Sequence, residues 1–548
     1  MGEEEMGGAP VGAGGGWLTW RAAAALAVAA AWLALHVAAR VADALWWRPR
    51  RLEAHFAAQG VRGPPYRFLL GSVKEMVALM AEASSKPMSP ATSHNALPRV
   101  LAFYHYWRKI YGPTFLIWFG PTPRLTVAEP ELVREIFLTR ADAFDRYEAH
   151  PVVRQLEGDG LVSLHGDKWA LHRRVLTDAF FPDNLNRLVP HVGRSVAALA
   201  EEWSAMAGAG EVEVDVAEWF QAVTEEAITR ATFGRSYDDG AAVFAMQGRL
   251  MAFASEAFRK VLVPGYRFLP TKKNWQSWKL DREIRRSLTR LIARRSDEAA
   301  ADSAAAGSGA FRDLLGAMIN AGAGGDRKAA IPVEDMLEEC KTFFFAGKQT
   351  TTNLLTWATV LLAMHPDWQE RARREVLEVC GPDELPSKEH LPKLKTLGMI
   401  MNETLRLYPP AVATIRRAKT DVQLSDGCMI PRDMELLVPI MAIHHDARFW
   451  GNDATQFNPE RFANGMARAA KHPLAFIPFG LGSRMCIGQN LARLEAKITM
   501  AILLQRFEMR TSPKYVHAPT VLMLLYPQYG APVIFRPRSA TPTDPSAS

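Results

Sequence analysis

The residues most able to do chemistry surround Cys486, in the segment FGLGSRMCIG. The spacing Phe-x-x-Gly-x-Arg-x-Cys-x-Gly suits a thiolate that binds haem iron, and a thiolate is a strong axial donor that favours O–O bond cleavage. Gly482 and Gly488 permit turns and close approaches that a side chain would block. Arg484 can donate to a haem propionate, Phe479 can shield the sulfur, and N–H groups after Cys486 can hydrogen-bond it. The alternative is one buried cysteine in a glycine-rich turn, which would not need the other fixed residues.

Together with distant segments, this motif resembles those of the cytochrome P-450 haem-thiolate monooxygenases, and the resemblance runs from about residue 64 to residue 537. The segment NETLRLYPP contains Glu403 and Arg406, and the later segment PERF contains Arg461. Taken alone, Glu403 and Arg406 are an i, i+3 pair that adds a few tenths of a kcal/mol to an exposed helix. The resemblance implies instead that Glu403, Arg406 and Arg461 form a buried ion network that supports the haem loop.

A third matching segment, AGKQTT, lies in a helix predicted from about 332 to 364. Glycine inside a helix costs about 1 kcal/mol, and the resemblance implies that the helix opens at Ala346 and Gly347 so that dioxygen and water fit. Thr350 matches the family's threonine, whose hydroxyl helps to deliver protons; the alternative is an ordinary helix-interior hydroxyl. The family usually has an acid where this chain has Gln349. An amide can organise water but cannot ionise, so the proton route stays open.

Further matches concern the haem propionates. The segment WALHR places Trp169 and Arg173 at i and i+4 on one helix face, where both can donate to a carboxylate. Arg416 matches another family position that meets a propionate. Its neighbour Arg417 leaves that assignment open by one residue.

A rival metal site needs weighing, because the segment His444-His445-Asp446 contains a His-x-Asp step that could supply two ligands to a non-haem iron. Such a site needs a third histidine, and the segment instead leads to PERF as it does in the family. The four cysteines show no Cys-x-x-Cys spacing and no disulfide framework.

Composition and charge point to a membrane and a redox partner. The formal net charge is +7 and the pI is about 9.2, but no basic stripe with interleaved aromatic residues indicates nucleic acid. Lys471, Arg493 and Lys497 flank the Cys486 loop, where an acidic flavoprotein face could dock; the alternative is an ordinary solvated face. The resemblance implies haem b ligated by Cys486 and electrons from NADPH through NADPH-cytochrome P-450 reductase, with cytochrome b5 as a further candidate donor.

The predicted fold is mainly α with a small β region, the cytochrome P-450 fold, with strands at 114–119 and 124–128. A single-pass anchor is expected because residues 22–39 are apolar except for His36. Acidic residues precede it and arginines follow, which predicts an endoplasmic-reticulum anchor with the catalytic domain in the cytosol; the alternative is a cleaved signal peptide. The expected organisation is a lumenal N-terminus (1–21), the anchor (22–39), a basic, proline-rich linker (40–65), the haem domain (66–538) and a disordered tail (539–548).

The segments AFDRYEAHP, LEGDGLVSL and FFFAGKQTT resemble those of the plant brassinosteroid 26-hydroxylases. That resemblance implies hydroxylation of the sterol side chain of castasterone-like hormones, which inactivates them. Gibberellins and other isoprenoid hormones are alternative substrates of the wider group. The residues expected in an apolar, sterol-sized pocket are Phe343, Val412, Ile415, Leu522 and Leu524, which would equally suit a plain core.

Two other function classes remain open. A haem-thiolate isomerase or lyase would rearrange a peroxide without a reductase, and NADPH-dependent turnover would exclude it. A non-catalytic haem protein would bind a ligand without forming product.

Overall fold

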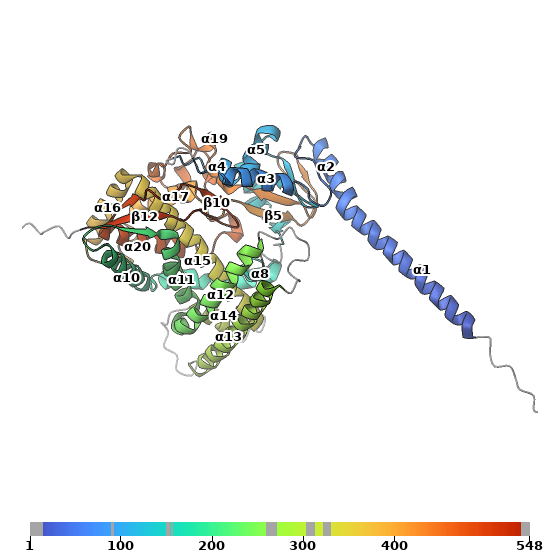
Figure 1. Ribbon diagram of the computed structural model, residues 1–548, viewed down its shortest axis with the longest axis horizontal. Helices are drawn as coiled ribbons and strands as arrows, with labels where there is room; N and C mark the ends of the chain where they lie inside the picture. The colour runs from blue at the N-terminus through green and yellow to red at the C-terminus, as the bar shows by residue number, and fades with distance from the viewer. Residues whose placement is uncertain are drawn as a thin grey trace, which may run out of the picture.

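The computed structural model describes residues 15–88, 93–148, 154, 157–258, 271–302, 313–321 and 330–538. The first helix, α1 (Gly15–Ala42), continues through a π-helical turn (Asp43–Trp47) into α2 (Arg48–Ala58). The span Trp20–Ala58 has a mean hydropathy of 2.0 in an 18-residue window, none of which is buried in protein, so it is long and apolar enough to cross a membrane. It extends away from the body of the protein (Figure 1), as a membrane anchor would.

The helix extends past the residues predicted to cross the membrane, and the bounds of the crossing itself stay a prediction. The helix is longer than the predicted anchor, 22–39, and the predicted linker, 40–65, is helical as far as Ala58. Pro49 does not break the helix because it lies in the first turn of α2, where its missing N–H is tolerated. Residues 1–14 of the predicted lumenal segment and the predicted tail, 539–548, lie outside the described residues.

The body is mainly helical. Its α-helices are α3 (Val73–Ser84), α4 (Leu97–Val100), α5 (Ala102–Tyr111), α6 (Pro130–Arg134), α8 (Gly166–Thr177), α9 (Pro182–Leu185), α10 (Val189–Ala207), α11 (Val216–Phe233), α12 (Tyr237–Phe258), α13 (Lys272–Asp302), α14 (Leu314–Asn320), α15 (Val333–Met364), α16 (Pro366–Cys380), α17 (Lys395–Leu407), α18 (Ile440–His444), α19 (Ala447–Trp450) and α20 (Gln489–Arg506). The helix expected over about 332–364 is α15. It is buried all round from Thr351 to Ala363, and α11, α17 and α20 pack along it, so α15 is the central helix of the core.

The strands are short. They are β1 (Leu116–Phe119), β2 (Thr122–Thr126), β3 (Phe144–Arg146), β4 (Val212–Asp215), β5 (Thr414–Ala418), β6 (Val422–Gln423), β7 (Met429–Ile430), β8 (Glu435–Val438), β9 (Phe507–Thr511), β10 (Pro519–Val521), β11 (Leu525–Pro527) and β12 (Pro532–Pro537). The largest sheet has the order β1-β2-β8-β5-β3, in which only the β2–β8 pair is parallel. The predicted strands correspond to β1 and β2, which pair Leu116 with Leu125.

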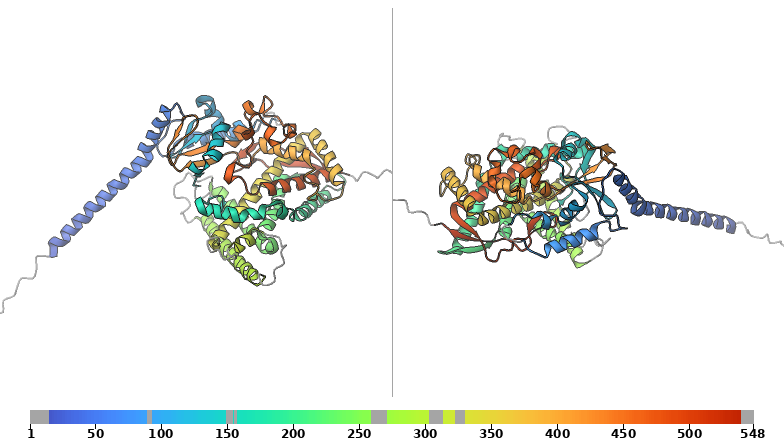
Figure 2. Two further views of the ribbon diagram at one scale, coloured as in Figure 1. Left: turned by 180° about the vertical axis from the view of Figure 1, so that it is seen from behind. Right: turned by 90° about the horizontal axis from the view of Figure 1, so that it is seen from above.

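Segments from both halves of the chain build this sheet, because β5 and β8 pair with strands from the first 150 residues. Both views in Figure 2 show C-terminal segments, coloured orange and red, among blue and cyan N-terminal ones. The arrangement brings the segment after α17 and the loop before α20 towards α8 and α15, which carry the other predicted site residues.

Candidate active site

Cys486 lies in a tight loop between a 3-10 turn (Gly482–Arg484) and the first residue of α20. The Cys486 N–H donates to the Phe479 carbonyl at 2.9 Å. Burial raises the pKa of the Cys486 thiol, whereas a hydrogen bond from the Gly488 N–H and the charge of Arg173 act to lower it. The side chain is nevertheless accessible to solvent. A thiol that is both accessible and surrounded by protein faces a recess, where a ligand can reach it.

The two glycines of the loop, Gly482 and Gly488, differ in whether neighbouring protein leaves room for a side chain. Gly482 has φ +75°, and a Cβ there would lie 2.2 Å from the Phe137 carbonyl oxygen, so no other residue fits without strain. A Cβ at Gly488 would lie 3.7 Å from Phe180, an ordinary contact. Neighbouring protein therefore excludes a side chain at Gly482 but not at Gly488, where the expected close approach stays a prediction.

Arginines gather beside this loop. Arg484 donates to Asp145 and to the Leu164 carbonyl, at 2.8 and 2.9 Å, and its guanidinium lies 4.5 Å from the Trp169 ring centroid. Burial would raise the pKa of Asp145, but hydrogen bonds from His165 and the Arg146 N–H, with the charge of Arg484, lower it overall. Asp145 is thus an ionised partner for Arg484.

Arg416, not Arg417, points towards this cluster. Arg416 is buried over the Phe137 ring, at 4.3 Å, and among the described residues it donates only to the Thr414 hydroxyl and the Ile415 carbonyl. Burial lowers its pKa to about 10, helped by the charges of Arg146 and Arg484. Arg417 instead pairs with the Asp433 carboxylate at 2.8 Å.

The residues present fit a haem. Arg173, on α8, has its pKa lowered by burial, and neither it nor Arg416 makes an ion pair within the described residues. One buried and one half-buried guanidinium, each without a carboxylate partner among the described residues, lie near a recessed thiol. This set matches a group that carries two propionates and an iron atom. Trp169 and Arg484 stand together at the same site.

Glu403, Arg406 and Arg461 form a buried ionic cluster. Glu403 and Arg406 are fully buried and make two hydrogen bonds of 2.7 Å to each other. The Arg461 Nε lies 3.6 Å from Glu403 Oε1. Arg406 also donates to the carbonyls of His444 and Ala454, so the cluster ties α17 to the chain that leads to the cysteine loop.

The histidines of the rival metal site have structural roles. His444 Nδ1 lies 3.2 Å from the Arg406 carbonyl oxygen, and its Nε2 accepts the Ile477 N–H at 3.0 Å, two residues before Phe479. Asp446 caps α19 and pairs with Arg108 and Arg448. No cluster of three or more potential ligands occurs among the described residues. His444 therefore links the ionic cluster to the cysteine loop instead of binding metal.

The AGKQTT segment forms regular helix where a local opening was expected. The Thr350 hydroxyl donates to the Ala346 carbonyl at 2.6 Å, and α15 is an uninterrupted helix there, so the expected local opening is not seen. Gly347 has another reason to be glycine: a Cβ would lie 2.5 Å from Cδ1 and Cγ1 of Ile228 on α11. Gln349 is half-buried, and its side chain makes no hydrogen bond to any described residue.

The predicted pocket residues divide into two groups. Ile415, Leu522 and Leu524 are partly exposed, at the end of β5 and at the tip between β10 and β11. Phe343 and Val412 are buried, and Phe343 stacks on Phe180 with ring centroids 5.6 Å apart. The first three are better placed to touch a ligand.

The three basic residues near the cysteine loop are not equally available to a partner. Lys471 is exposed. Lys497 is half-buried and donates to the Leu391 carbonyl at 2.7 Å, and Arg493 lies over the Phe479 ring at 5.2 Å. Arg493 and Lys497 therefore stabilise the fold around the loop.

Sequence reasoning missed two carboxylates. Asp145 has no local signal, since 339 residues separate it from Arg484. Glu339 accepts from the buried His172 at 2.6 Å and from the Leu161 N–H at 2.9 Å. The Glu339–His172 pair fixes α8, with Trp169 and Arg173, against α15. Only the histidine was visible in the WALHR segment, and nothing there indicated a partner.

Fold and site together define a thiolate-ligated haem enzyme. Residues 98–533 match the family described as Cytochrome P450, and the chain belongs to that family. The predicted fold and enzyme class are confirmed: the protein is a haem-thiolate monooxygenase. Family membership implies electrons from a redox partner and a small-molecule substrate.

Several curated proteins are similar over nearly the whole chain. Cytochrome P450 734A2 of Oryza sativa subsp. japonica is 85% identical, with 99% of each chain covered. Cytochrome P450 734A1 of Arabidopsis thaliana is 59% identical, over 90% of this chain and 93% of the relative. Cytochrome P450 CYP72A616 of Paris polyphylla is 42% identical, over 94% and 99%. The first two similarities support a monooxygenase of the 734 group.

Proposed function

We propose that this enzyme hydroxylates the side chain of a brassinosteroid hormone at C-26, using O2 and NADPH, and thereby inactivates the hormone. The observation that carries the proposal is the 85% identity to a 734A protein along 99% of the chain. The three sequence segments that resemble those of brassinosteroid 26-hydroxylases support the same substrate. The partly exposed, apolar Ile415, Leu522 and Leu524 suit a hydrocarbon side chain.

The protein's own groups prepare the site. Cys486 would bind the haem iron through its thiolate, and the Gly488 N–H stabilises negative charge on the sulfur. Arg173, Arg416 and Arg484 would hold the propionates of a bound haem and so orient it. When bound, haem supplies oxygen activation at its iron atom.

Proton delivery falls to Thr350. Its hydroxyl proton is donated to the Ala346 carbonyl, which leaves the Oγ1 lone pairs free to accept a hydrogen bond from water. Gln349 can hold such a water through its amide but cannot release a proton of its own. The proton must therefore arrive through water that Thr350 Oγ1 holds in place as a hydrogen-bond acceptor.

The test uses microsomes that contain the full chain and a plant reductase, given castasterone with or without NADPH. NADPH-dependent gain of one oxygen at C-26, identified by mass spectrometry, is expected. Cys486→Ser is the matched inactive control. Absence of product from castasterone, in preparations that turn over a gibberellin, would replace this substrate with another isoprenoid hormone.

The two other function classes would give different results in that assay. An isomerase or lyase would form product without NADPH or dioxygen. A non-catalytic haem protein would show a substrate-induced spectral change and no product, and its behaviour would not depend on Thr350. The hydroxyl of Thr350 and the intact cysteine loop favour the monooxygenase.

The proposed location is the endoplasmic-reticulum membrane, with one crossing and the catalytic body in the cytosol. The helix over Trp20–Ala58 and the arginines that follow its apolar part support this orientation. NADPH-cytochrome P-450 reductase is the proposed electron donor, with cytochrome b5 as a further candidate, and exposed Lys471 is available for docking. Protease digestion of intact microsomes should remove the body and spare an N-terminal tag.

A further inference from the structure

A chain of hydrogen bonds joins His365, His94, Tyr408, His517 and Tyr515, none of which is among the residues assigned to haem binding. His94 Nδ1 lies 2.8 Å from the Tyr408 hydroxyl, which lies 3.0 Å from His517 Nε2. At the two ends, His94 Nε2 lies 3.0 Å from His365 Nε2, and His517 Nδ1 lies 2.7 Å from the Tyr515 hydroxyl. The three central members are almost completely buried.

These central groups are neutral. Burial lowers the pKa of His94 to about 3 and that of His517 to about 4, and it raises the pKa of Tyr408. A neutral imidazole has one donor and one acceptor, and a phenol has one donor, so the bonds must run in one direction along the chain. Removing the Tyr408 hydroxyl would take a hydrogen-bond partner from a buried imidazole on each side.

Tyr408 connects two segments of the proposed pocket. His517 immediately precedes the hairpin β10–β11, whose tip carries Leu522 and Leu524. On the other side of the tip, the Leu525 N–H donates to the carbonyl of Pro410 at 2.9 Å. The hairpin is thus held on both sides of its tip by the segment that begins at Tyr408 and continues towards Ile415.

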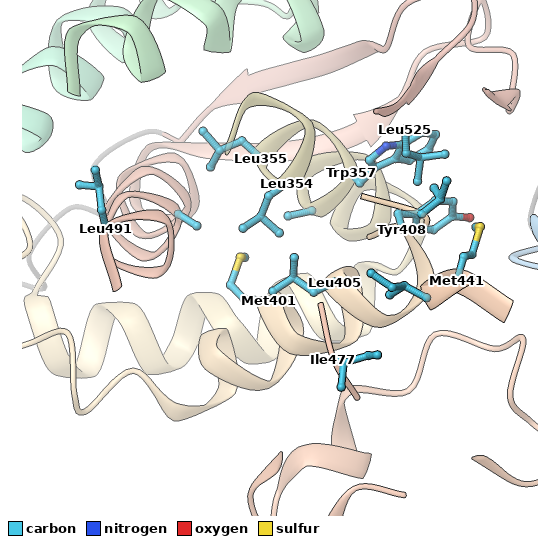
Figure 3. Close-up of a cluster of buried hydrophobic side chains, with 14 of the residues drawn as sticks. Leu354, Leu355, Trp357, Met401, Leu405, Tyr408, Met441, Ile477, Leu491 and Leu525 are labelled. Atoms are coloured by element: carbon cyan, nitrogen blue, oxygen red, sulfur yellow. The ribbon is translucent and has the colours of Figure 1, made fainter. Parts of the chain in front are cut away.

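The same phenol ring also contacts the helix that carries Thr350. Tyr408 stacks on Trp357 with ring centroids 4.3 Å apart and planes 9° from parallel. Figure 3 shows Trp357 and Tyr408 side by side with Leu525 next to them. Trp357 follows Thr350 by seven residues, about two helical turns, so both lie on one face of α15. Tyr408 therefore contacts both the hairpin that carries the pocket tip and the helix that carries the Thr350 hydroxyl.

We propose that Tyr408 is a positioning residue that holds the Leu522–Leu524 tip at a set place relative to Thr350 and so selects which carbon of the substrate side chain is oxidised. The assignment rests on the proposed steroid hydroxylation. A terminal methyl such as C-26 must be presented ahead of neighbouring side-chain carbons, and a displaced tip would present those carbons as well.

The first test measures the hairpin itself. Tyr408→Phe keeps the ring that stacks on Trp357 but removes the hydroxyl. Amide hydrogen exchange at Leu525, in the purified full-length haem protein, should become about fivefold faster, because a buried hydrogen bond that holds the hairpin is lost. Tyr526→Phe is the matched control. It also removes a hydroxyl from this hairpin, but the Tyr526 hydroxyl makes no hydrogen bond to a described residue. Unchanged exchange in Tyr408→Phe would overturn the proposal.

The second test measures the products formed from castasterone. In Tyr408→Phe, the ratio of C-26 product to other side-chain products should fall about fivefold, with the reduced carbon-monoxide spectrum unchanged. An unaltered product ratio would also overturn the proposal. If wild-type enzyme does not oxidise castasterone, the substrate proposal fails while the exchange measurement still decides whether Tyr408 holds the hairpin.

A second pair of variants covers the case in which Tyr408→Phe fails to fold. His517→Gln retains a donor and an acceptor, whereas His517→Leu has neither. The product ratio should be preserved by glutamine and lost with leucine. Equal ratios in the two variants would contradict the proposed role of the hydrogen bonds.

Discussion

Arg484, two residues before the cysteine, donates a hydrogen bond of 2.8 Å to Asp145, which lies on β3 of the main sheet. This pair fastens the cysteine loop to a segment 339 residues earlier in the chain. Because Asp145 also lies 2.9 Å from His165, just before α8, the carboxylate joins the loop, the sheet and the helix that carries Trp169 and Arg173.

Asp145→Asn should therefore weaken haem retention. The neutral amide leaves Arg484 without a counter-charge in a partly buried place, at a cost of about 2 kcal/mol. Since the pKa of Asp145 is lowered in the folded protein, its contribution is present above the ordinary aspartate value of about 4 and is lost as the pH falls through the lowered pKa. Thermal loss of haem absorbance measures this, with exposed Asp142→Asn as control. Equal midpoints for the two variants would contradict it.

Cys486→Ser should abolish the reduced carbon-monoxide band that thiolate ligation gives in this family, together with all hydroxylation. A serine hydroxyl is too weak an acid to replace the thiolate. Cys428→Ser, at a buried cysteine outside the site, should keep both properties. A thiolate band in Cys486→Ser would remove the ligand assignment.

Thr350→Ala should keep haem but divert NADPH consumption to hydrogen peroxide, because Oγ1 no longer holds the water that carries protons to the site. Product formed per NADPH should fall about tenfold or more. Thr351→Ala removes the neighbouring hydroxyl, which is buried in the core, and should couple normally. Full coupling in Thr350→Ala would exclude its hydroxyl from the mechanism.

Gly347→Ala should destabilise the fold by about 1 to 3 kcal/mol, since the new Cβ overlaps Ile228. Adding Ile228→Ala removes the overlapping atoms, so the double variant should be more stable than the sum of the two single changes predicts. Unfolding in denaturant, followed by fluorescence, measures all three proteins. Additive effects would mean that Gly347 is needed for a reason other than helix packing.

Stability should fall as the medium is acidified from neutrality. Burial lowers the pKa of His94, His444 and His445 to about 3 and that of His517 to about 4. Below the unfolded value of about 6.5, the unfolded chain binds protons that the folded one does not, so each histidine costs about 1 kcal/mol per pH unit.

Denaturant midpoints measured between about pH 7 and pH 5 test this expectation. His445→Gln should reduce the slope of unfolding free energy against pH by about 1 kcal/mol per pH unit, because it removes one buried histidine that stays neutral in the folded protein. A slope identical to that of the wild type would show that His445 does not stay neutral when folded.

Several parts of the site were accessible from sequence because they are local. The cysteine loop, the Glu403–Arg406 pair and the Trp169–Arg173 pair each lie within one short segment, where residue spacing alone sets which side chains share a turn or a helix face. The central helix and the first two strands followed from apolar periodicity for the same reason.

Contacts between distant segments were decided only by the tertiary structure. Asp145 meets Arg484, and Ile228 explains Gly347, because packing brings together elements whose separation along the chain carries no signal. The choice of Arg416 over Arg417 depended on which face of β5 is buried. Sequence by itself determined the haem-thiolate chemistry. The packing of α15, α17 and the β10–β11 hairpin decided the position of Tyr408 between the pocket and the helix, since a buried hydrogen bond needs both partners in place.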